Sequence, residues 1–382
     1  MATGTGTGRT RRLVLDLPLV FAVACIAVLG LLNLRSAVSV VNLTFYETQL
    51  EWFAAGGTAA VVVWLVDNRV FLRYTWIGYG LVLVLLVLVL AVGREANQAQ
   101  RWLNLGPIGL QPSEFMKIAV ILAVARVFHG EVRPDPRTLK DFILPGLPTA
   151  VPTYLVLKQP DLGTALIYPL IFLSMSTVLR IRVRSVLLAL LGIAVSVPIA
   201  WSLLHGYQKE RVVTFFASLF SKGQLDVQDA AWQTTQSKIA VGSGHIFGKG
   251  FLHGTQNQLG FVPFQHTDFP FAVWGEEHGF VGVALLIALY LFVVLWALRI
   301  AGRARDRFGA LVAVGVAAMI FWHVAINMGM VLGLLPVVGV TLPLFSYGGS
   351  SVLANLIGVG LLLSVSARRT GSPWEGLGRR LG

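Results

Sequence analysis

The sequence has few charged residues and almost no cysteine. Of its 382 residues 13% are charged and 55% are hydrophobic, whereas soluble domains carry roughly 25% charged residues. The single cysteine, Cys25, excludes a disulfide within the chain and disfavours a metal site built on thiolates. Long apolar runs on this background predict an all-α polytopic membrane protein.

The sequence also lacks the common motifs of several enzyme classes. It contains no HExxH, no paired Cys/His metal pattern, no GxSxG and no GxxxxGK[ST]. A zinc hydrolase, a serine hydrolase and a P-loop nucleotide site therefore have no support. No basic soluble face with interleaved aromatic residues is present, so the net charge of +12 does not indicate a nucleic-acid partner.

Apolar runs suited to a hydrocarbon core of about 30 Å recur about ten times. The first run has no evident cleavage site, so we expect an uncleaved first helix. The chain then divides into a tail (1–12), one transmembrane domain (13–366) and a second tail (367–382). The predicted spans lie near 13–34, 52–66, 75–93, 114–128, 142–157, 161–179, 185–204, 270–298, 308–330 and 350–366.

Two segments of the transmembrane domain do not fit a simple span. The polar stretch 205–269 is a large loop between the seventh and eighth spans, and within it 207–220 sets charges beside an aromatic face. That pattern predicts a helix lying on the membrane surface. The segment 334–351 is too broken by proline and glycine to span, so we expect a re-entrant or extended segment buried against protein.

Positive charge gives the orientation. With the N-terminus inside, twenty lysines and arginines fall in inner segments and nine in outer segments. Inner loops of membrane proteins carry this excess. The pattern predicts cytoplasmic termini and an extracytoplasmic loop at 205–269.

The distinctive polar residues gather near the outer face, which suggests one outer cleft. Each has a structural alternative that the sequence leaves open. Asp268 could cap the following helix, Glu114 and Lys117 could simply pair on one helix face, and Arg211 could anchor a headgroup. His323 is expected to be a hydrogen-bonded interior histidine, and Asp161 could start a helix.

Several motifs together resemble the SEDS family of cell-wall proteins, the RodA, FtsW and SpoVE group. The resemblance covers nearly the whole chain, and the segment LGFVPFQHTDFPF is closest to the RodA, elongation-type branch. The motifs are QRWLNLGPIGLQPSEFMKIAV, KQPDLGTALI, QKERVVTF, QSKIAVGSGHIFGKGF, QNQLGFVPFQHTDFPFAVWGEEHGFVG and NMGMVLGLLPVVGVTLPLFSYGGSS.

The resemblance implies ten transmembrane helices and residence in the bacterial cytoplasmic (inner) membrane. It also implies a peptidoglycan glycosyltransferase that polymerises lipid II into glycan strands outside the membrane. The family's essential acid maps to Asp268, the implied catalytic residue. Two departures stand beside it, because Gln265 replaces an expected basic residue and Pro270 an expected Ile or Val. The candidate substrate-binding residues are Glu114, Lys117, Arg211, His266, Thr267, Ser346 and Ser350.

The implied chemistry needs a base and a charge partner. A carboxylate at Asp268 can deprotonate the acceptor hydroxyl as the bond to pyrophosphate breaks, with inversion at the anomeric carbon. Lys117 and Arg211 are the expected phosphate binders. No protein metal site or certain cofactor is expected, although a divalent cation (Mg or Mn) could neutralise the pyrophosphate.

The resemblance also implies partners, and two other functions compete with it. The family pairs with a class B penicillin-binding protein, a transpeptidase, within the elongation machinery, and it acts on lipid II and a lipid-linked strand. A lipid flippase would keep polar groups near the midplane, whereas here they lie near the outer face. A non-catalytic scaffold for the transpeptidase would leave Asp268 dispensable.

Overall fold

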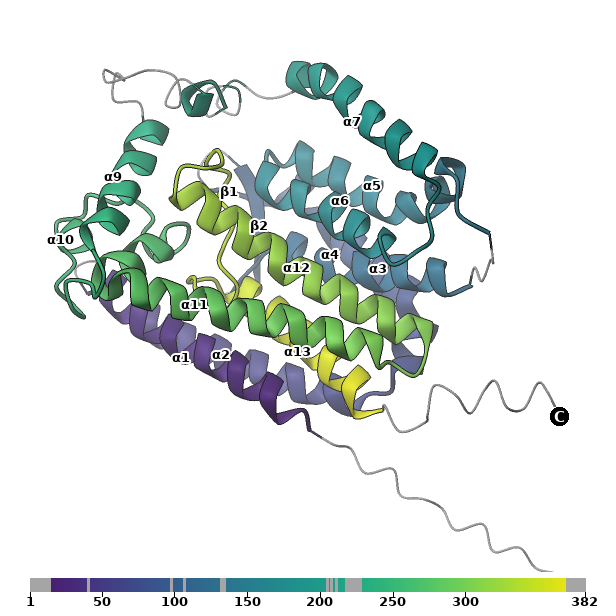
Figure 1. Cartoon of the computed structure of the whole chain (residues 1–382), viewed down its shortest axis with the longest axis horizontal. Helices are drawn as coiled ribbons and strands as arrows, with labels where there is room; N and C mark the ends of the chain where they lie inside the picture. The colour runs from purple at the N-terminus through teal and green to yellow at the C-terminus, as the bar shows by residue number, and fades with distance from the viewer. Residues whose placement is uncertain are drawn as a thin grey trace, which may run out of the picture.

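The computed structural model describes residues 15–39, 42–96, 99–105, 108–130, 135–203, 206, 209, 212–216 and 229–368. Helices dominate this part of the chain, and their arrangement is shown in Figure 1. Before the large loop come α1 (Leu17–Ala37), α2 (Thr44–Leu65), α3 (Asn68–Val92), α4 (Pro112–Gly130), the 3-10 turn η1 (Leu139–Phe142), α5 (Ile143–Lys158), α6 (Leu162–Ser176) and α7 (Val183–Leu203). After them come α9 (Asp229–Ser243), α10 (Thr255–Gln258), α11 (Pro270–Gly302), α12 (Arg307–Val331) and α13 (Gly349–Ala367).

Each of the ten predicted spans falls on one helix of the fold, which confirms the all-α class. Five helices, α1, α3, α11, α12 and α13, are long and apolar enough to cross a membrane by length and hydropathy. The other predicted spans fall on α2, α4, α5, α6 and α7. That all ten helices cross the membrane, and that the large loop lies outside, remain predictions.

Two helices form the centre of the bundle. In their most apolar windows 67% of α12 and 89% of α13 is buried, against 17% of α3. The sequence of α13 is rich in glycine, alanine and serine, and small residues let helix backbones approach closely in membranes. At Gly360 the backbone of α2 is so near that an added Cβ would lie 2.7 Å from the carbonyl oxygen of Ala60. The α2–α13 pair therefore depends on this close approach.

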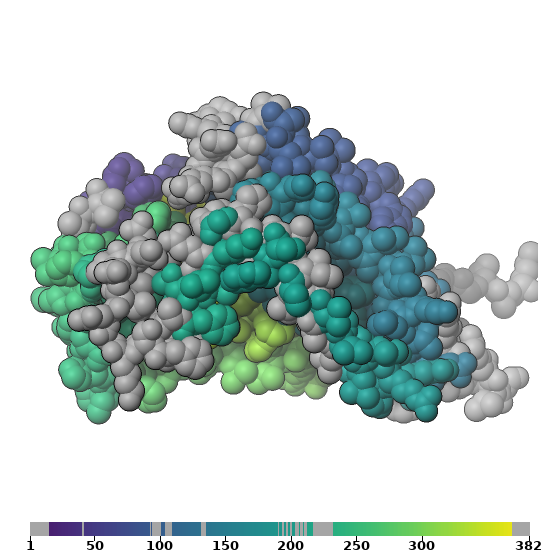
Figure 2. Space-filling model, turned by 90° about the horizontal axis from the view of Figure 1, so that it is seen from above, coloured from purple at the N-terminus to yellow at the C-terminus, as the bar shows by residue number. Residues whose placement is uncertain are grey.

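The helix α7 lies apart from the bundle. Its main packing partner is η1, and apolar side chains such as Leu187, Leu191 and Val195 are exposed. Seen from above, α7 forms a teal ridge over a hollow whose floor is yellow-green (Figure 2). Exposed apolar residues on a membrane helix are suited to lipid contact.

The structure adds features that the span pattern does not predict. A three-stranded antiparallel sheet, β1 (Arg94–Ala96), β2 (Ala99–Leu105) and β3 (Ile108–Leu110), connects α3 to α4. Of the predicted surface helix at 207–220, residues 209 and 212–216 are described and are helical. The tail 1–12 and residues 369–382 of the second tail lie outside the described residues.

The segment between α12 and α13 has no regular structure and is largely buried, as predicted, except at its start, where Leu332, Leu334 and Leu335 are exposed. Val337, Val340, Leu342 and Phe345 are each at most 5% exposed. Backbone polar groups in such a segment need partners, and Asn327 of α12 supplies one by donating to the carbonyl oxygen of Val340 at 2.7 Å. We call residues 332–348 the connecting segment; it packs against α1, α6 and the residues around Asp268.

Two buried acids fasten the large loop to the bundle. Glu276 and Glu277, in the first part of α11, are 0% and 1% exposed. Glu276 accepts from the Lys249 Nζ at 2.6 Å and from the Gln256 amide at 3.0 Å, while Glu277 accepts from the Ser36 hydroxyl. Ordinary solvated acids at a helix end would not be enclosed in this way. The φ of +62° at Gly279, which favours glycine, marks a kink just beyond them.

Candidate active site

Asp268 lies in a tight turn directly before α11. The carbonyl oxygen of Phe264 accepts from the amides of Thr267, Asp268 and Phe269, at 3.0–3.2 Å. The N-cap of α11 is Phe269, with Pro270 at the first helical turn and no side-chain cap hydrogen bond. The capping role that the sequence left open for Asp268 is therefore not the one it has in this fold.

The main chain of Asp268 is held by Asn327 of α12, which also binds the connecting segment. Asn327 donates one side-chain hydrogen bond to the carbonyl oxygen of Asp268 at 2.9 Å and another to that of Val340 at 2.7 Å. The Asp268 Oδ2 atom lies 3.6 Å from the position of a Cβ built on Gly339. A half-buried carboxylate is thus presented on a fixed backbone, which is the preorganisation that a general base needs.

His266 and Thr267 share this turn. The His266 ring stacks on Phe45, with ring centroids 5.1 Å apart, and its carbonyl oxygen accepts from the Tyr347 amide at 2.8 Å. Burial lowers the pKa of His266, so the ring is neutral near pH 7. The Thr267 hydroxyl makes a long contact of 3.4 Å with the carbonyl oxygen of Phe264.

The two predicted serines lie close by, in structural hydrogen bonds. The Ser346 hydroxyl accepts from the Leu342 amide at 2.8 Å, inside the turn that precedes α13. The Ser350 hydroxyl accepts from the Gln111 amide at 3.0 Å and so joins α13 to the start of α4. Both side chains are buried, and their role toward a substrate remains a prediction.

Lys117 and Glu114 form a buried pair on α4. The Lys117 Nζ lies 2.7 Å from Glu114 Oε2 and 2.8 Å from the Nε2 of His323, and Lys117 is 1% exposed. Because His323 Nδ1 meets the carbonyl oxygen of Met319 at 2.7 Å, Nδ1 carries the proton and Nε2 accepts from the ammonium. This confirms His323 as a hydrogen-bonded interior histidine, and it places the amine of Lys117 away from bulk solvent.

One face of α12 connects the buried Lys117–Glu114 pair with the turn that carries Asp268, residues 264–269, which we call the aspartate turn. His323 holds Lys117, and Asn327, four residues later on the same helix face, holds Asp268. Four residues rise about 6 Å along a helix. Asn327 is not among the residues that the sequence motifs single out; the signal for it is an amide side chain one turn from His323 in an apolar helix.

Two further residues from the sequence motifs are Asp161 and Arg211. Asp161 caps α6 by accepting from the Thr164 amide at 3.2 Å, so the predicted helix start is confirmed, and Arg101 lies 3.8 Å from it. Arg211, the second expected phosphate binder, lies outside the described residues. Within the described part of the chain, no three His, Cys, Asp or Glu side chains are grouped as a metal site requires.

The fold and this site define a class, a polytopic α-helical membrane protein with a polar turn at one end of its helices. The family model for FtsW, RodA and SpoVE, described as a cell cycle protein, matches residues 16–371. The chain belongs to this family.

Three individual similarities accompany the family match. The peptidoglycan glycosyltransferase MrdB of Escherichia coli K12 is 41% identical over 324 residues, which cover 85% of this chain and 86% of MrdB. A chain from a solved peptidoglycan synthase complex matches with a TM-score of 0.80 and 35% identity, covering 94% of this chain and 100% of that one. The rod shape determining protein RodA of Thermus thermophilus matches with a TM-score of 0.70 and 33% identity, covering 94% and 99%.

Proposed function

We propose that this protein is a peptidoglycan glycosyltransferase of the inner membrane that polymerises lipid II into glycan strands during cell elongation. The similarity to the Escherichia coli peptidoglycan glycosyltransferase MrdB supports the activity. The similarity to the rod shape determining protein RodA of Thermus thermophilus supports the elongation role. The structural observation that carries the proposal is Asp268, half-buried, in a turn that Asn327 holds and without a capping role.

In the proposed reaction Asp268 is the general base. It takes the proton of the acceptor sugar hydroxyl while that oxygen attacks the anomeric carbon of the donor and the pyrophosphate leaves, with inversion. Such a base contributes roughly 10²–10⁴-fold to the rate. The leaving pyrophosphate needs positive charge, for which Arg211 and Lys117 are the proposed sources.

The buried position of Lys117 limits the form of this second role. Its ammonium contacts Glu114 and His323 and is 1% exposed, so direct contact with phosphate would require the pair to open. The closed arrangement instead suits a positioning role, in which the Lys117–His323 contact fixes the α12 face that carries Asn327. Both forms are part of the proposal, and the Lys117 variants discussed below separate them.

A divalent cation remains part of the proposal only in a form carried by the substrate. The described residues offer no cluster of three metal-ligating side chains. Mg²⁺ commonly binds through one or two carboxylates together with phosphate oxygens and water. Pyrophosphate oxygens and water would fit that pattern without taking Asp268 away from its role as base, so a chelator should lower polymerisation and added Mg²⁺ or Mn²⁺ should restore it.

A partner transpeptidase completes the proposal. The solved complex to which this chain is similar is described as coordinating polymerisation and crosslinking. The described residues form one helical bundle, to which the described part of the large loop is fastened, and include no separate soluble domain. We therefore propose that a class B penicillin-binding protein supplies crosslinking, and that the polymer-forming unit is the complex of the two chains.

The first prediction tests Asp268 in the purified complex on synthetic lipid II. Asp268→Asn keeps the side-chain size but cannot accept a proton at working pH, so polymer formation should fall by roughly 10²–10⁴-fold. Thermal unfolding and partner binding should change little, because Asn keeps the size and polarity of the side chain and the bond from Asn327 goes to the main chain. Gel separation of the glycan strands measures the product.

Asp268→Glu is the matched control. It retains the carboxylate but moves it by about 1 Å, which can cost around 10²-fold, so weak residual activity is expected. Near-normal polymer from Asp268→Asn would reject the general base. The flippase alternative would hold if lipid II crossed vesicle membranes equally with both variants while neither the native protein nor a variant formed glycan polymer. Intact crosslinking by the partner, with no glycan polymer made from lipid II, would favour the scaffold.

A further inference from the structure

We propose that the end of the bundle opposite Asp268 carries a second binding site, which takes a phosphate-bearing anion. A cavity of about 530 Å³ lies there, among the ends of α2, α3, α4, α12 and α13. At this end Ser366 of α13 donates to Asp16, just before α1 begins, whereas the aspartate turn contacts the last residue of α1, Ala37, through Gln265. The two sites are therefore separated by the length of the bundle.

The acids of the cavity are already engaged. Asp67 accepts from the Arg69 amide at 2.9 Å and lies 3.5 Å from the Arg368 guanidinium, while Asp306 accepts from the Gly309 amide at 2.7 Å. Arg368 is fixed further by the carbonyl oxygens of Leu65 and Ser364, at 3.1 and 2.9 Å. These groups form a rigid wall of two carboxylates and one guanidinium, whose charge is negative until the two further arginines of the cavity are counted.

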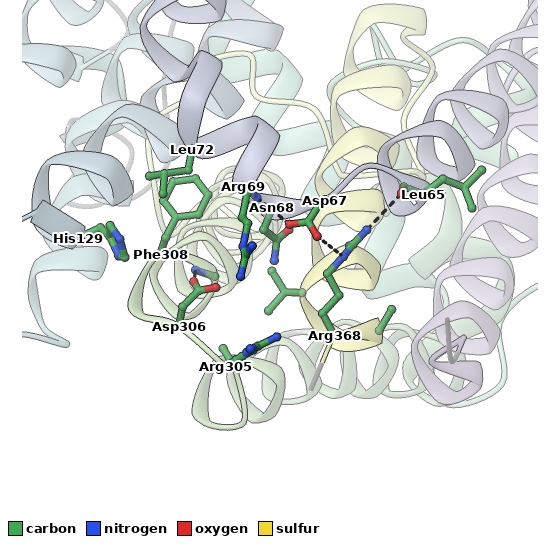
Figure 3. Close-up of a pocket in the computed structure, with 14 residues that line it drawn as sticks. Leu65, Asp67, Asn68, Arg69, Leu72, His129, Arg305, Asp306, Phe308 and Arg368 are labelled. Atoms are coloured by element: carbon green, nitrogen blue, oxygen red, sulfur yellow. Dashed lines mark hydrogen bonds and ion pairs between the residues drawn. The ribbon is translucent and has the colours of Figure 1, made fainter. Parts of the chain in front are cut away.

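Two further arginines lack such partners. Among the described residues, the guanidinium groups of Arg69 and Arg305 make no hydrogen bond or ion pair, and both side chains are exposed. Figure 3 shows them extending from opposite sides into the space between the helix ends. His129, whose ring packs edge-on against Phe308 at 6.3 Å, adds a buried Nδ1 without a partner in the described chain. The cavity therefore offers unmet donors and net positive charge.

Two arginines on a flat protein surface are usually only solvated. Arg69 and Arg305 differ because they line a cavity. The cavity volume falls within the range of about 300–1,000 Å³ that is typical of ligand sites. Guanidinium groups match the oxygens of phosphate with paired, charge-assisted hydrogen bonds. A single negative phosphodiester or a free phosphate would fit between two unpaired arginines.

The walls favour a lipid as the source of the phosphate. Leu65, Leu72 and Phe308 line the same cavity, so apolar surface adjoins the arginines at the ends of the membrane helices. Basic pockets between such helices bind anionic headgroups. A phosphatidylglycerol headgroup is therefore the expected occupant, with soluble phosphate or pyrophosphate as the competing source of the same chemistry.

The test uses the full-length protein in neutral detergent and measures thermal unfolding during titration. Dioleoylphosphatidylglycerol, dioleoylphosphatidylcholine, inorganic phosphate and pyrophosphate are the four probes. A ligand that binds only the folded protein raises the unfolding temperature as its concentration exceeds the Kd. The variant is Arg69→Gln with Arg305→Gln, and the control is Arg303→Gln, an exposed arginine near Arg305 that does not line the cavity.

Phosphatidylglycerol, but not phosphatidylcholine, should stabilise the native protein and the control, with affinity weakened about tenfold or more in the double variant. Stabilisation by pyrophosphate without phosphatidylglycerol, again lost in the double variant, keeps the site and assigns a soluble source. Equal affinity in the double variant, or stabilisation by none of the phosphate compounds, overturns the proposal. The two single variants replace the double variant if it fails to fold. Because this site lies away from Asp268, these outcomes do not depend on glycan polymerisation.

Discussion

At the scale of single residues, polar side chains hold the region around the aspartate turn in place. Asn327 fixes the backbones of Asp268 and Val340, and His323, one turn away, fixes the ammonium of Lys117. A buried polar group is stabilising only when its partners are all present, because a partner left alone keeps its full desolvation cost. Single and paired substitutions should therefore differ strongly in this group.

The Lys117 prediction uses that difference. Lys117→Met leaves the Glu114 carboxylate buried without its cation, which should cost about 3–5 kcal/mol of stability. Adding Glu114→Gln removes the orphaned charge and should restore most of the unfolding temperature. Thermal unfolding and polymerisation are measured on both variants.

The comparison of the two readouts assigns the role. If Lys117 contributes to the reaction, by contact with phosphate or by positioning α12, the double variant regains stability while its activity stays low. Recovery of both stability and activity would reduce the Lys117–Glu114 pair to a structural ion pair. Loss of a contact with the pyrophosphate would raise KM for the lipid-linked donor and lower kcat together, whereas loss of a positioning role would lower kcat alone.

His266 gives a prediction for pH. Burial holds its folded pKa below the ordinary value of 6.5, so the unfolded chain binds the proton more readily. Stability from the neutral ring is complete above pH 6.5 and is lost as pH falls through the folded pKa. The unfolding temperature should therefore drop more steeply between about pH 7 and 5 in the native protein than in His266→Phe, which keeps the stack on Phe45. Parallel pH profiles would contradict this.

At the scale of elements, apolar run length predicts the helices well, and the polar details depend on distant contacts. All ten predicted spans fall on helices because a run of about 20 apolar residues has few other stable forms in a membrane. The enclosure of Glu276 by Lys249 and of Glu277 by Ser36 joins residues 27 and 241 positions apart, which no local pattern encodes. The short sheet before α4 likewise lacks a strong apolar alternation.

In the candidate site, local residues were likewise predictable from the sequence, whereas their contacts with other helices were not. The motif around Asp268 located the turn, but the partners that hold it, Asn327 and Phe45, lie on other helices. The pairing of Glu114 with Lys117 follows from their spacing of three, because such residues share a helix face. The contact of Lys117 with His323 does not follow from spacing, because it depends on how α4 packs against α12.

The close approach of α2 and α13 gives a prediction for an element pair. Gly360→Ala would place its Cβ 2.7 Å from the Ala60 carbonyl oxygen, a backbone atom that cannot move cheaply. Overpacking of this kind costs about 1–3 kcal/mol, so the unfolding temperature should fall. Gly57→Ala on α2 is the control, since its Cβ would meet nothing within 4 Å. There the gain in helix propensity, about 1 kcal/mol, should leave stability equal or higher.

At the scale of the whole molecule, the bundle has two unlike ends. The aspartate turn, the connecting segment and the large loop share one end. The arginine cavity lies at the other end, where α1 begins and α13 ends. The proposed polymerisation of lipid II outside the membrane requires the first end to be extracytoplasmic. The excess of lysine and arginine in the segments at the second end agrees with that orientation, since such residues stay inside.

The last prediction tests this orientation with cysteine labelling in whole spheroplasts. Cys25→Ser first removes the native thiol, and then Phe247→Cys in the large loop or Arg303→Cys after α11 supplies one exposed thiol. A membrane-impermeant maleimide should modify position 247 in intact spheroplasts and position 303 only after the membrane is opened with detergent. Both positions are exposed in the fold, so a difference reports sidedness rather than burial. Labelling at position 303 and protection at position 247 would put Asp268 on the cytoplasmic side, where a polymerase for outer glycan strands could not use it.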